Sequence, residues 1–192
     1  MEPFRSTAFR LAVAASLLGC SSSIAQSGVV NGDFDSGLEG WEFPDAMPTW
    51  SPFDAGGSTQ SGSAYGIHPG GENRNCVLRQ CIALPDSGRR VLSVQVYTPP
   101  GQGAGNLVLS YSARYNAPAC TGGSFAVGGR YLPSIGAWTH HAVSFPVEAV
   151  PHPPGTTVEV QLCLDAPAQG PFDGYFDRIQ LHHDLLLRSG FE

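Results

Sequence analysis

The chain contains no lysine, so each of its fixed positive charges is an arginine. It has 10 such residues against 16 Asp and Glu, and its formal net charge is −6. The arginines are scattered, whereas a protein that holds nucleic acid or an anionic membrane surface needs a basic cluster. The composition therefore predicts no nucleic-acid partner and no binding to an anionic membrane.

Long apolar runs are also missing, and we predict no transmembrane segment. The apolar run at residues 11–18 follows two arginines and is too short to cross a bilayer, which is typical of an export signal. A small-x-small motif after it predicts a signal peptide at residues 1–25. The alternative is a lipoprotein box that acylates Cys20. Both interpretations predict a secreted, periplasmic or extracellular protein.

The motifs of common catalytic sites are absent as well. There is no G-x-S-x-G elbow, no H-E-x-x-H and no phosphate-binding loop. Two adjacent histidine pairs, at 140–141 and 182–183, lie on expected strands, so the members of each pair point to opposite faces and cannot chelate one ion. A glycosidase needs two carboxylates across a cleft, and the sequence fixes no such pair. We predict a non-catalytic protein, with a small glycan-active hydrolase as an alternative.

Glycine (24 residues) and proline (16 residues) are abundant, as expected for short strands joined by turns. Apolar and polar residues alternate with period two in several segments, which gives each strand one buried and one wet face. Residues 43–57 contain three prolines and are expected to form a long loop. Strands are expected at 63–67, 77–84, 91–97, 107–116, 138–147, 157–164 and 175–181.

These elements predict an all-β domain at residues 26–184, followed by a short tail at 185–192. About eight to ten short strands with wet outer faces are typical of a two-sheet antiparallel β-sandwich, here a jelly roll. We find neither an internal repeat nor an amphipathic helix after the export signal.

Four cysteines remain after Cys20, an even number that predicts two disulfides in an oxidising compartment. Four cysteines allow three connectivities, which the sequence cannot separate. We favour a local Cys76–Cys81 loop together with a Cys120–Cys163 bridge. A zinc site is the alternative, although the spacing lacks paired C-x-x-C motifs.

The segment 31–41 combines three carboxylates, several glycines and two aromatic rings without a positive charge. Glycine allows tight turns that aim carbonyl oxygens inward, and calcium takes carboxylate and carbonyl oxygens. The segment therefore predicts a cation site, and the alternative is a solvated acidic turn before a core Trp41. An EF-hand does not fit, because Ser36 stands where that loop needs glycine.

A second carboxylate of interest lies in the expected last strand. Asp177 shares the two-residue phase of Ile179 and Leu181, so its side chain is predicted to point toward the core. A buried unpaired carboxylate is costly. We expect Arg178, a bound cation, or water beyond the sheet edge to compensate it.

If the wet face of one sheet is a binding face, it presents aromatic rings, which can cover apolar ligand surface, and planar polar side chains, which can bind hydroxyl groups. The alternative is an ordinary polar sheet face with a loop tryptophan buried locally, and Trp41 and Trp138 are expected in the core. The candidate binding residues are Trp50, Gln95, Tyr97, Ser112, Arg114 and Asn116.

Four motifs occur in one order along the chain: N-G-D-F-D-x-G-x-x-G-W at 31–41, S-G-S-A-Y at 61–65, a W-to-F strand at 138–145, and Y-F-D-x-I-x-L at 175–181. Together they resemble the CenC-type carbohydrate-binding modules of the galactose-binding-like jelly-roll superfamily, over nearly the whole mature chain.

The resemblance implies a polysaccharide or other glycan as partner. It also implies a structural calcium where the first and last strands meet, held by Asp35 and Asp177 with Asp33 as a substitute ligand. The second hypothesis is a structural or adhesive extracellular protein that keeps the jelly roll without sugar affinity. The sequence specifies neither the sugar nor the oligomeric state.

Overall fold

The computed structural model describes eight stretches of the chain, namely residues 28–71, 73–84, 88–102, 104–114, 118–121, 123–147, 156–166 and 170–184. The expected signal peptide, Cys20, the C-terminal tail and Asn116 lie outside them. Within these stretches the strands are β1 (Thr49–Ser51), β2 (Ser63–His68), β3 (Asn75–Ala83), β4 (Gly88–Tyr97), β5 (Asn106–Arg114), β6 (Ser124–Leu132), β7 (Thr139–Val147), β8 (Thr157–Asp165) and β9 (Phe172–His183), and a short 3₁₀ turn, η1 (Pro118–Cys120), follows β5.

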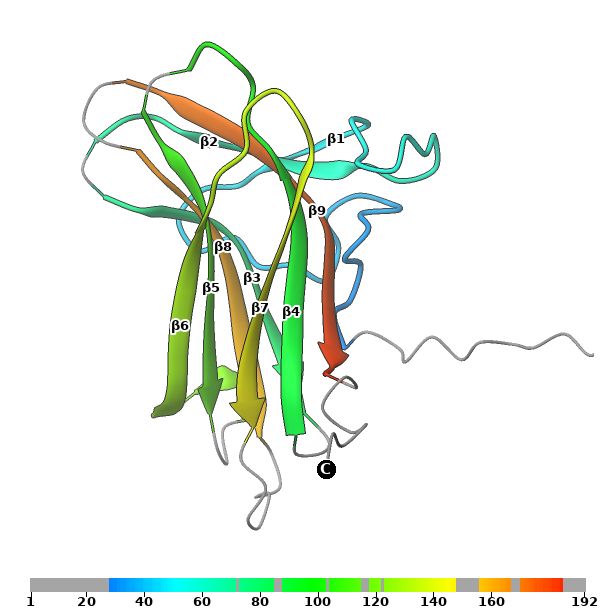
Figure 1. The fold of residues 1–192 in the computed structure, drawn as a ribbon, viewed down its shortest axis with the longest axis vertical. Coiled ribbons are helices and arrows are strands. Elements are labelled where there is room, and N and C mark those ends of the chain that lie inside the picture. The colour runs from blue at the N-terminus through cyan, green and yellow to red at the C-terminus, as the bar shows by residue number, and fades with distance from the viewer. Residues whose placement is uncertain are drawn as a thin grey trace, which may run out of the picture.

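The strands form two antiparallel sheets that pack face to face. One sheet has five strands in the order β1-β2-β9-β4-β7, and the other has four in the order β3-β8-β5-β6. Figure 1 shows the long strands of both layers running along the vertical axis of the view. The predicted all-β, two-sheet antiparallel sandwich is confirmed. No helix in the described part of the chain is long and apolar enough to cross a membrane.

The period-two alternation identifies the core-facing residues of β5 and β8 correctly. In β5, Leu107, Leu109 and Ala113 are fully buried, and the expected inward residues of β8 are fully buried too. The loop expected at 43–57 contains the short edge strand β1. Strand β6 was not predicted, because two adjacent glycines interrupt its pattern; a Cβ on Gly128 would come within 2.5 Å of the Tyr111 hydroxyl.

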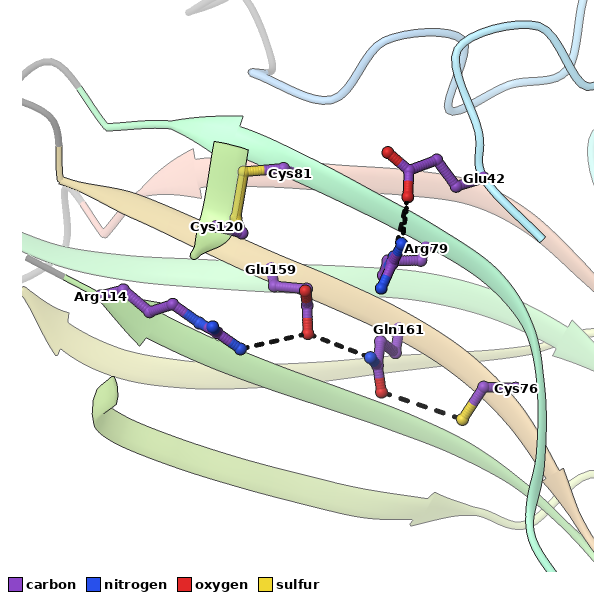
Figure 2. Close-up of polar contacts among 8 residues, drawn as sticks. All are labelled: Glu42, Cys76, Arg79, Cys81, Arg114, Cys120, Glu159 and Gln161. Atoms are coloured by element: carbon purple, nitrogen blue, oxygen red, sulfur yellow. Dashed lines mark hydrogen bonds and ion pairs between the residues drawn. A yellow bond between two sulfur atoms is a disulfide. The ribbon is translucent and has the colours of Figure 1, made fainter. Parts of the chain in front are cut away.

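The favoured disulfide pairing is wrong. The bonds join Cys76 to Cys163 and Cys81 to Cys120, and Figure 2 shows the second bond between β3 and η1. Cys76 and Cys81 lie on one extended strand, where five residues span about 16 Å. That distance is far beyond the reach of a disulfide. Cys76 instead lies directly opposite Cys163 on the neighbouring strand β8.

The first described segment packs against the last strand, as the resemblance implied. The backbone N–H of Ile179 donates a 2.9 Å hydrogen bond to the carbonyl of Gly32. A Cβ on Gly32 would clash with the carbonyl oxygen of Ile179, so only glycine allows this approach. Trp41 is 6% exposed and its Nε1 donates to the carbonyl of Asn31 at 3.1 Å, which confirms its place in the core.

Candidate functional site

The predicted ligand-binding residues fall on three separate surfaces. Gln95 and Tyr97 alternate with fully buried residues of β4, so both lie on the outer face of the five-stranded sheet. Arg114 belongs to β5 in the other sheet, and its partner Glu159 lies on β8. The single binding face that the sequence suggested is therefore not formed, because the segments that contain these residues join different sheets.

Trp50 lies apart from both sets. Its register partner in β2 is Ala64, a fully buried residue, so its ring projects away from the outer face. The indole Nε1 donates a 2.8 Å hydrogen bond to the carbonyl of Phe34, and the ring packs over Gly62. Trp50 is still 39% exposed and lines a shallow groove of about 630 Å³ with Trp41 and other mostly apolar residues.

The outer face of the four-stranded sheet has mutually bonded polar side chains. An oxygen of Glu159 lies 3.5 Å from the guanidinium of Arg114, and the same oxygen accepts a 3.0 Å hydrogen bond from Gln161 (Figure 2). Arg79 pairs with Glu42 beside them. These side chains bond to one another, which agrees with the alternative prediction of an ordinary polar sheet face.

An aromatic row crosses the outer face of the five-stranded sheet. Tyr65, Tyr175 and Tyr97 are direct register partners on β2, β9 and β4. The ring centroids of Tyr65 and Tyr175 are 4.7 Å apart, those of Tyr175 and Tyr97 5.8 Å, and Trp138 extends the row at 5.7 Å from Tyr97. Trp138 is half-buried on this face and is not in the core, which corrects the prediction for it.

Phe53 lies against this row. Its ring centroid is 4.8 Å from that of Tyr97 and 5.2 Å from those of Trp138 and Tyr175, and its side chain is 40% exposed. We call the set of Phe53 and the four rings of the row the aromatic face. Phe53 comes from a segment that the sequence predicted as loop, and cross-strand register brings the other rings together, so local pattern alone could not find the set.

The loop that carries Phe53 is held by its own hydrogen bonds. The Asp54 carboxylate accepts 2.7 Å bonds from the backbone N–H groups of Gly56 and Ser58, and a 2.6 Å bond from the hydroxyl of Ser61. Burial opposes the charged form of Asp54, but these bonds outweigh it and lower the pKa of the carboxyl. The loop is therefore a fixed wall of the aromatic face.

Polar groups border the rings. The Tyr65 hydroxyl donates a 2.6 Å hydrogen bond to Oδ2 of Asp173, and burial together with this carboxylate raises the pKa of Tyr65 well above its usual value. The other carboxylate oxygen of Asp173 and the Nε1 of Trp138 are buried and have no hydrogen-bond partner in the described part of the chain. One acceptor and one donor at this face are thus unused.

Asp177 lies on the same outer side, and the predicted core-facing phase is wrong. Gln95 pairs with Asp177 whereas Ser93 pairs with Gln180, so β9 contains a bulge between them. Arg178, in the bulge, adopts a left-handed φ of 49°. The extra residue reverses the side-chain phase, and Asp177 shares a face with Tyr175 rather than with the core residues that follow it.

Asp177 is nevertheless 0% exposed, so the carboxylate is buried as predicted although it lies on the other face of the sheet. It accepts hydrogen bonds from the backbone N–H of Ala55 at 2.8 Å and of Arg178 at 2.6 Å. Burial raises its pKa to about 7, with further increases from nearby Asp54 and Asp33, while the two hydrogen bonds act in the opposite direction.

The predicted calcium ligands do not form a cluster of three acidic side chains in the described residues. No group of three or more His, Cys, Asp or Glu side chains in the described stretches is placed to hold a metal. Both oxygens of Asp177 already accept N–H donors, and the exposed Asp35 binds Asn31 through its backbone N–H. Burial and then Asp35 raise the pKa of Asp33, whereas the charge of Arg178 lowers it. A calcium ion here stays a prediction.

Comparison with known proteins shows the fold and no closer relationship. No protein-family model matches the sequence, and no curated protein matches it. The domain is similar in structure to the enzymatically active domain of tailspike protein 4 of bacteriophage CBA120, with a TM-score of 0.59 at 14% identity. That match covers 81% of this chain and 21% of the tailspike chain.

Two carbohydrate-binding modules match over their whole length or nearly so. TmCBM61, solved with β-1,4-galactotriose, has a TM-score of 0.55 at 12% identity, and the match covers 83% of this chain and 100% of that module. The CBM22-2 xylan-binding domain of Paenibacillus barcinonensis Xyn10C has a TM-score of 0.50 at 12% identity, with 79% and 97% covered. The chain therefore has the β-sandwich fold of carbohydrate-binding modules.

Proposed function

We propose that the protein is a non-catalytic glycan-binding module and that its aromatic face is the binding site. Structures with the same fold include one solved with a galactotriose and one described as xylan-binding, which supports a polysaccharide as the ligand class. The finer assignment to the CenC type rests on the sequence motifs alone.

One observation carries the proposal: a partly exposed aromatic side chain lies on a row of four rings that crosses one sheet face. Phe53 is 40% exposed, and Oδ1 of Asp173 and Nε1 of Trp138 have no partner in the described residues. A sugar ring has an apolar face that an aromatic ring can cover and hydroxyls that both donate and accept hydrogen bonds. The unpaired donor and acceptor are themselves buried, so Phe53 and the half-buried rings of the row are the groups that a sugar can contact directly.

The set of binding residues changes accordingly. Gln95 and Tyr97 stay at the proposed site, whereas Trp50 and Arg114 lie elsewhere on the sandwich. Asn116, outside the described residues, stays a prediction. Phe53, Tyr65, Trp138, Asp173 and Tyr175 are added.

The direct test is binding of the mature protein to β-1,4-galactan, xylan and a wider glycan panel, measured by calorimetry. Phe53→Ala removes the exposed ring and is expected to weaken binding about tenfold, or ~1.4 kcal/mol. Tyr131→Ala is the matched control, because Tyr131 is 55% exposed on β6 in the other sheet. The proposal fails if no glycan binds, or if the two variants bind alike.

A structural or adhesive protein without sugar affinity is the second candidate. It is favoured by the packing of Phe53 on Tyr97, Trp138 and Tyr175, because rings that already pack against one another need no ligand to cover them. The absence of binding to every glycan of the panel would support it. A small glycan-active hydrolase would instead be supported by polysaccharide turnover that a single carboxylate substitution abolishes.

Export fits either candidate. Two disulfides are typical of proteins that fold in an oxidising compartment outside the cytosol. We propose delivery by a cleaved signal peptide, with a lipid anchor at Cys20 as the alternative. Mass spectrometry of the mature N-terminus separates the two.

A further inference from the structure

A cavity of about 320 Å³ lies at one end of the sandwich, separate from the aromatic face. It is lined by residues 98–99, 101–102 and 104–106, from the end of β4 to the start of β5, and by residues 132–135, from the last residue of β6 onward. Both segments lie at the upper end of the view in Figure 1. Leu132 and Phe172, which are 1% and 2% exposed, contribute to its apolar lining.

The cavity lining has no charged side chain among the described residues. Thr98, Gln102, Asn106 and Ser134 line it with hydroxyl and amide groups beside the apolar residues. The Gln102 amide and the Ser134 hydroxyl already bond to the backbone of the wall, which leaves Thr98 and Asn106 as the side chains that can face a ligand. An ion would lose its hydration there without meeting a counter-charge, which is unfavourable. A small neutral ligand with several hydroxyls matches this mixture of hydrogen-bonding and apolar groups.

The cavity wall is held in place before any ligand arrives. The backbone N–H of Gly136 donates to the carbonyl of Thr98 at 2.9 Å, which ties the two segments together. The Ser134 hydroxyl lies 2.7 Å from the carbonyl of Ala137 and 3.1 Å from that of Val96. A preorganised wall lowers the entropic cost of binding.

The same wall borders the aromatic face. The Gln102 amide accepts a 2.5 Å hydrogen bond from the backbone N–H of Asp173 and donates a 3.0 Å bond to its carbonyl. Asp173 in turn binds Tyr65 on the aromatic face. Asp173 therefore connects the cavity wall to the aromatic face.

We propose that this cavity is a second binding site, which takes one neutral sugar unit at a chain end or on a short branch. The inference rests on the proposed function for its ligand class, and it adds a site that receives a terminus rather than the middle of a chain. Ligand pockets generally span about 300–1,000 Å³, so this one is suited to a small unit.

The test uses a variant that fills the cavity and a matched control. Ala104 lines the cavity and is exposed, so Ala104→Trp places a large ring in the space without disturbing the core. Ala83, exposed at the end of β3 and outside the cavity lining, provides the control Ala83→Trp. Amide NMR spectra of the mature protein are titrated with methyl xyloside, methyl galactoside and glucuronic acid.

We expect a neutral glycoside to cause saturable shifts at the amides of Gly101, Gln102 and Ser134 in the wild type and in Ala83→Trp. Ala104→Trp should bind about tenfold more weakly, and glucuronic acid should cause no saturable shift. If Ala104→Trp does not fold, Ile135→Ala removes an apolar wall residue that is 79% exposed and should also weaken binding. Equal binding by the wild type and the cavity variants, or no shift at these amides, overturns the proposal.

Failure of this inference can be told from failure of the proposed function by adding a polysaccharide pull-down. If the polysaccharide binds the wild type but no glycoside shifts the cavity amides, the cavity proposal falls and the aromatic face stands. If no polysaccharide binds but a glycoside saturates the cavity, the cavity stands and the aromatic face falls. Loss of polysaccharide binding in Phe53→Ala, with cavity shifts retained, supports both sites.

Discussion

The backbone N–H of Ala55 donates a 2.8 Å hydrogen bond to the carboxylate of Asp177, across 122 residues of sequence. The bond fastens the loop that carries Phe53 to strand β9, where a bulge turns Asp177 toward the outer face. A buried carboxylate thus holds one wall of the aromatic face, and its protonation is linked to the stability of the whole domain.

The pH dependence of stability should reveal this group. The folded chain raises the pKa of Asp177 from 3.8 to about 7. The folded state binds this proton more tightly than the unfolded state does, so the free energy of unfolding should fall as pH rises from about 4 to about 7 and then level off. The upper limit of the effect is roughly 4 kcal/mol, at ~1.4 kcal/mol per pH unit.

Urea unfolding at several pH values, in the presence of EDTA, measures this effect. Asp177→Asn should remove the decline, so the difference between wild type and variant isolates the one group. Asp35→Asn is the control, because Asp35 is exposed. Parallel pH profiles for wild type and Asp177→Asn would refute the prediction.

A side chain at Gly32 should destabilise the junction between the first segment and β9. An added Cβ meets the Ile179 carbonyl oxygen, which must move away and lose its close packing. We expect Gly32→Ala to lower the free energy of unfolding by about 1–3 kcal/mol. Gly123→Ala is the matched control, because nothing lies within 4 Å of a Cβ at that position. Equal melting temperatures would show that the junction contributes little.

The calcium prediction can be decided by chelation. If an ion binds at Asp35, Asp177 and Asp33, EDTA should lower the melting temperature and added calcium should restore it. Asp177→Ala should then melt at one temperature with or without EDTA. A wild type whose melting temperature does not change with EDTA contradicts the prediction. The positive charge near these carboxylates would then be the guanidinium of Arg178, whose charge lowers the pKa of Asp33 and of Asp54.

The disulfide pairing predicts both a peptide map and an order of stabilities. Digestion without reduction should yield peptides linked through Cys76–Cys163 and through Cys81–Cys120. Replacing either pair with alanine should cost about 2–5 kcal/mol, somewhat more for the first pair because it closes the longer loop. The separations along the chain are 87 and 39 residues. A peptide that contains a Cys76–Cys81 bond would contradict the structure.

The strands themselves could be predicted from local pattern. Alternation in the segment from Leu107 to Ala113 identifies the buried side of β5, because period two follows from the geometry of any extended chain. The same rule failed at Asp177, where one residue of bulge shifts the phase. It also missed β6, where Gly128 stands in place of an apolar residue because Tyr111 fills that space.

Most residues of the candidate site could not be predicted from the sequence. Tyr97 was identified because its own strand shows that it points outward. Tyr65 and Tyr175 flank one another only because β2 and β9 pair in one register. Gln95 and Arg114 look equivalent in the sequence, yet their strands enter different sheets and face opposite sides of the sandwich.

The amino-acid sequence alone predicted an all-β sandwich from local periodicity and two disulfides from cysteine number, and the family resemblance of its ordered motifs implied that the first segment meets the last strand. The tertiary structure decided which cysteines pair, where Asp177 points and which rings form the aromatic face. These depend on strand pairing between residues far apart in the chain, and a register is set by the packing of the whole core rather than by any one segment.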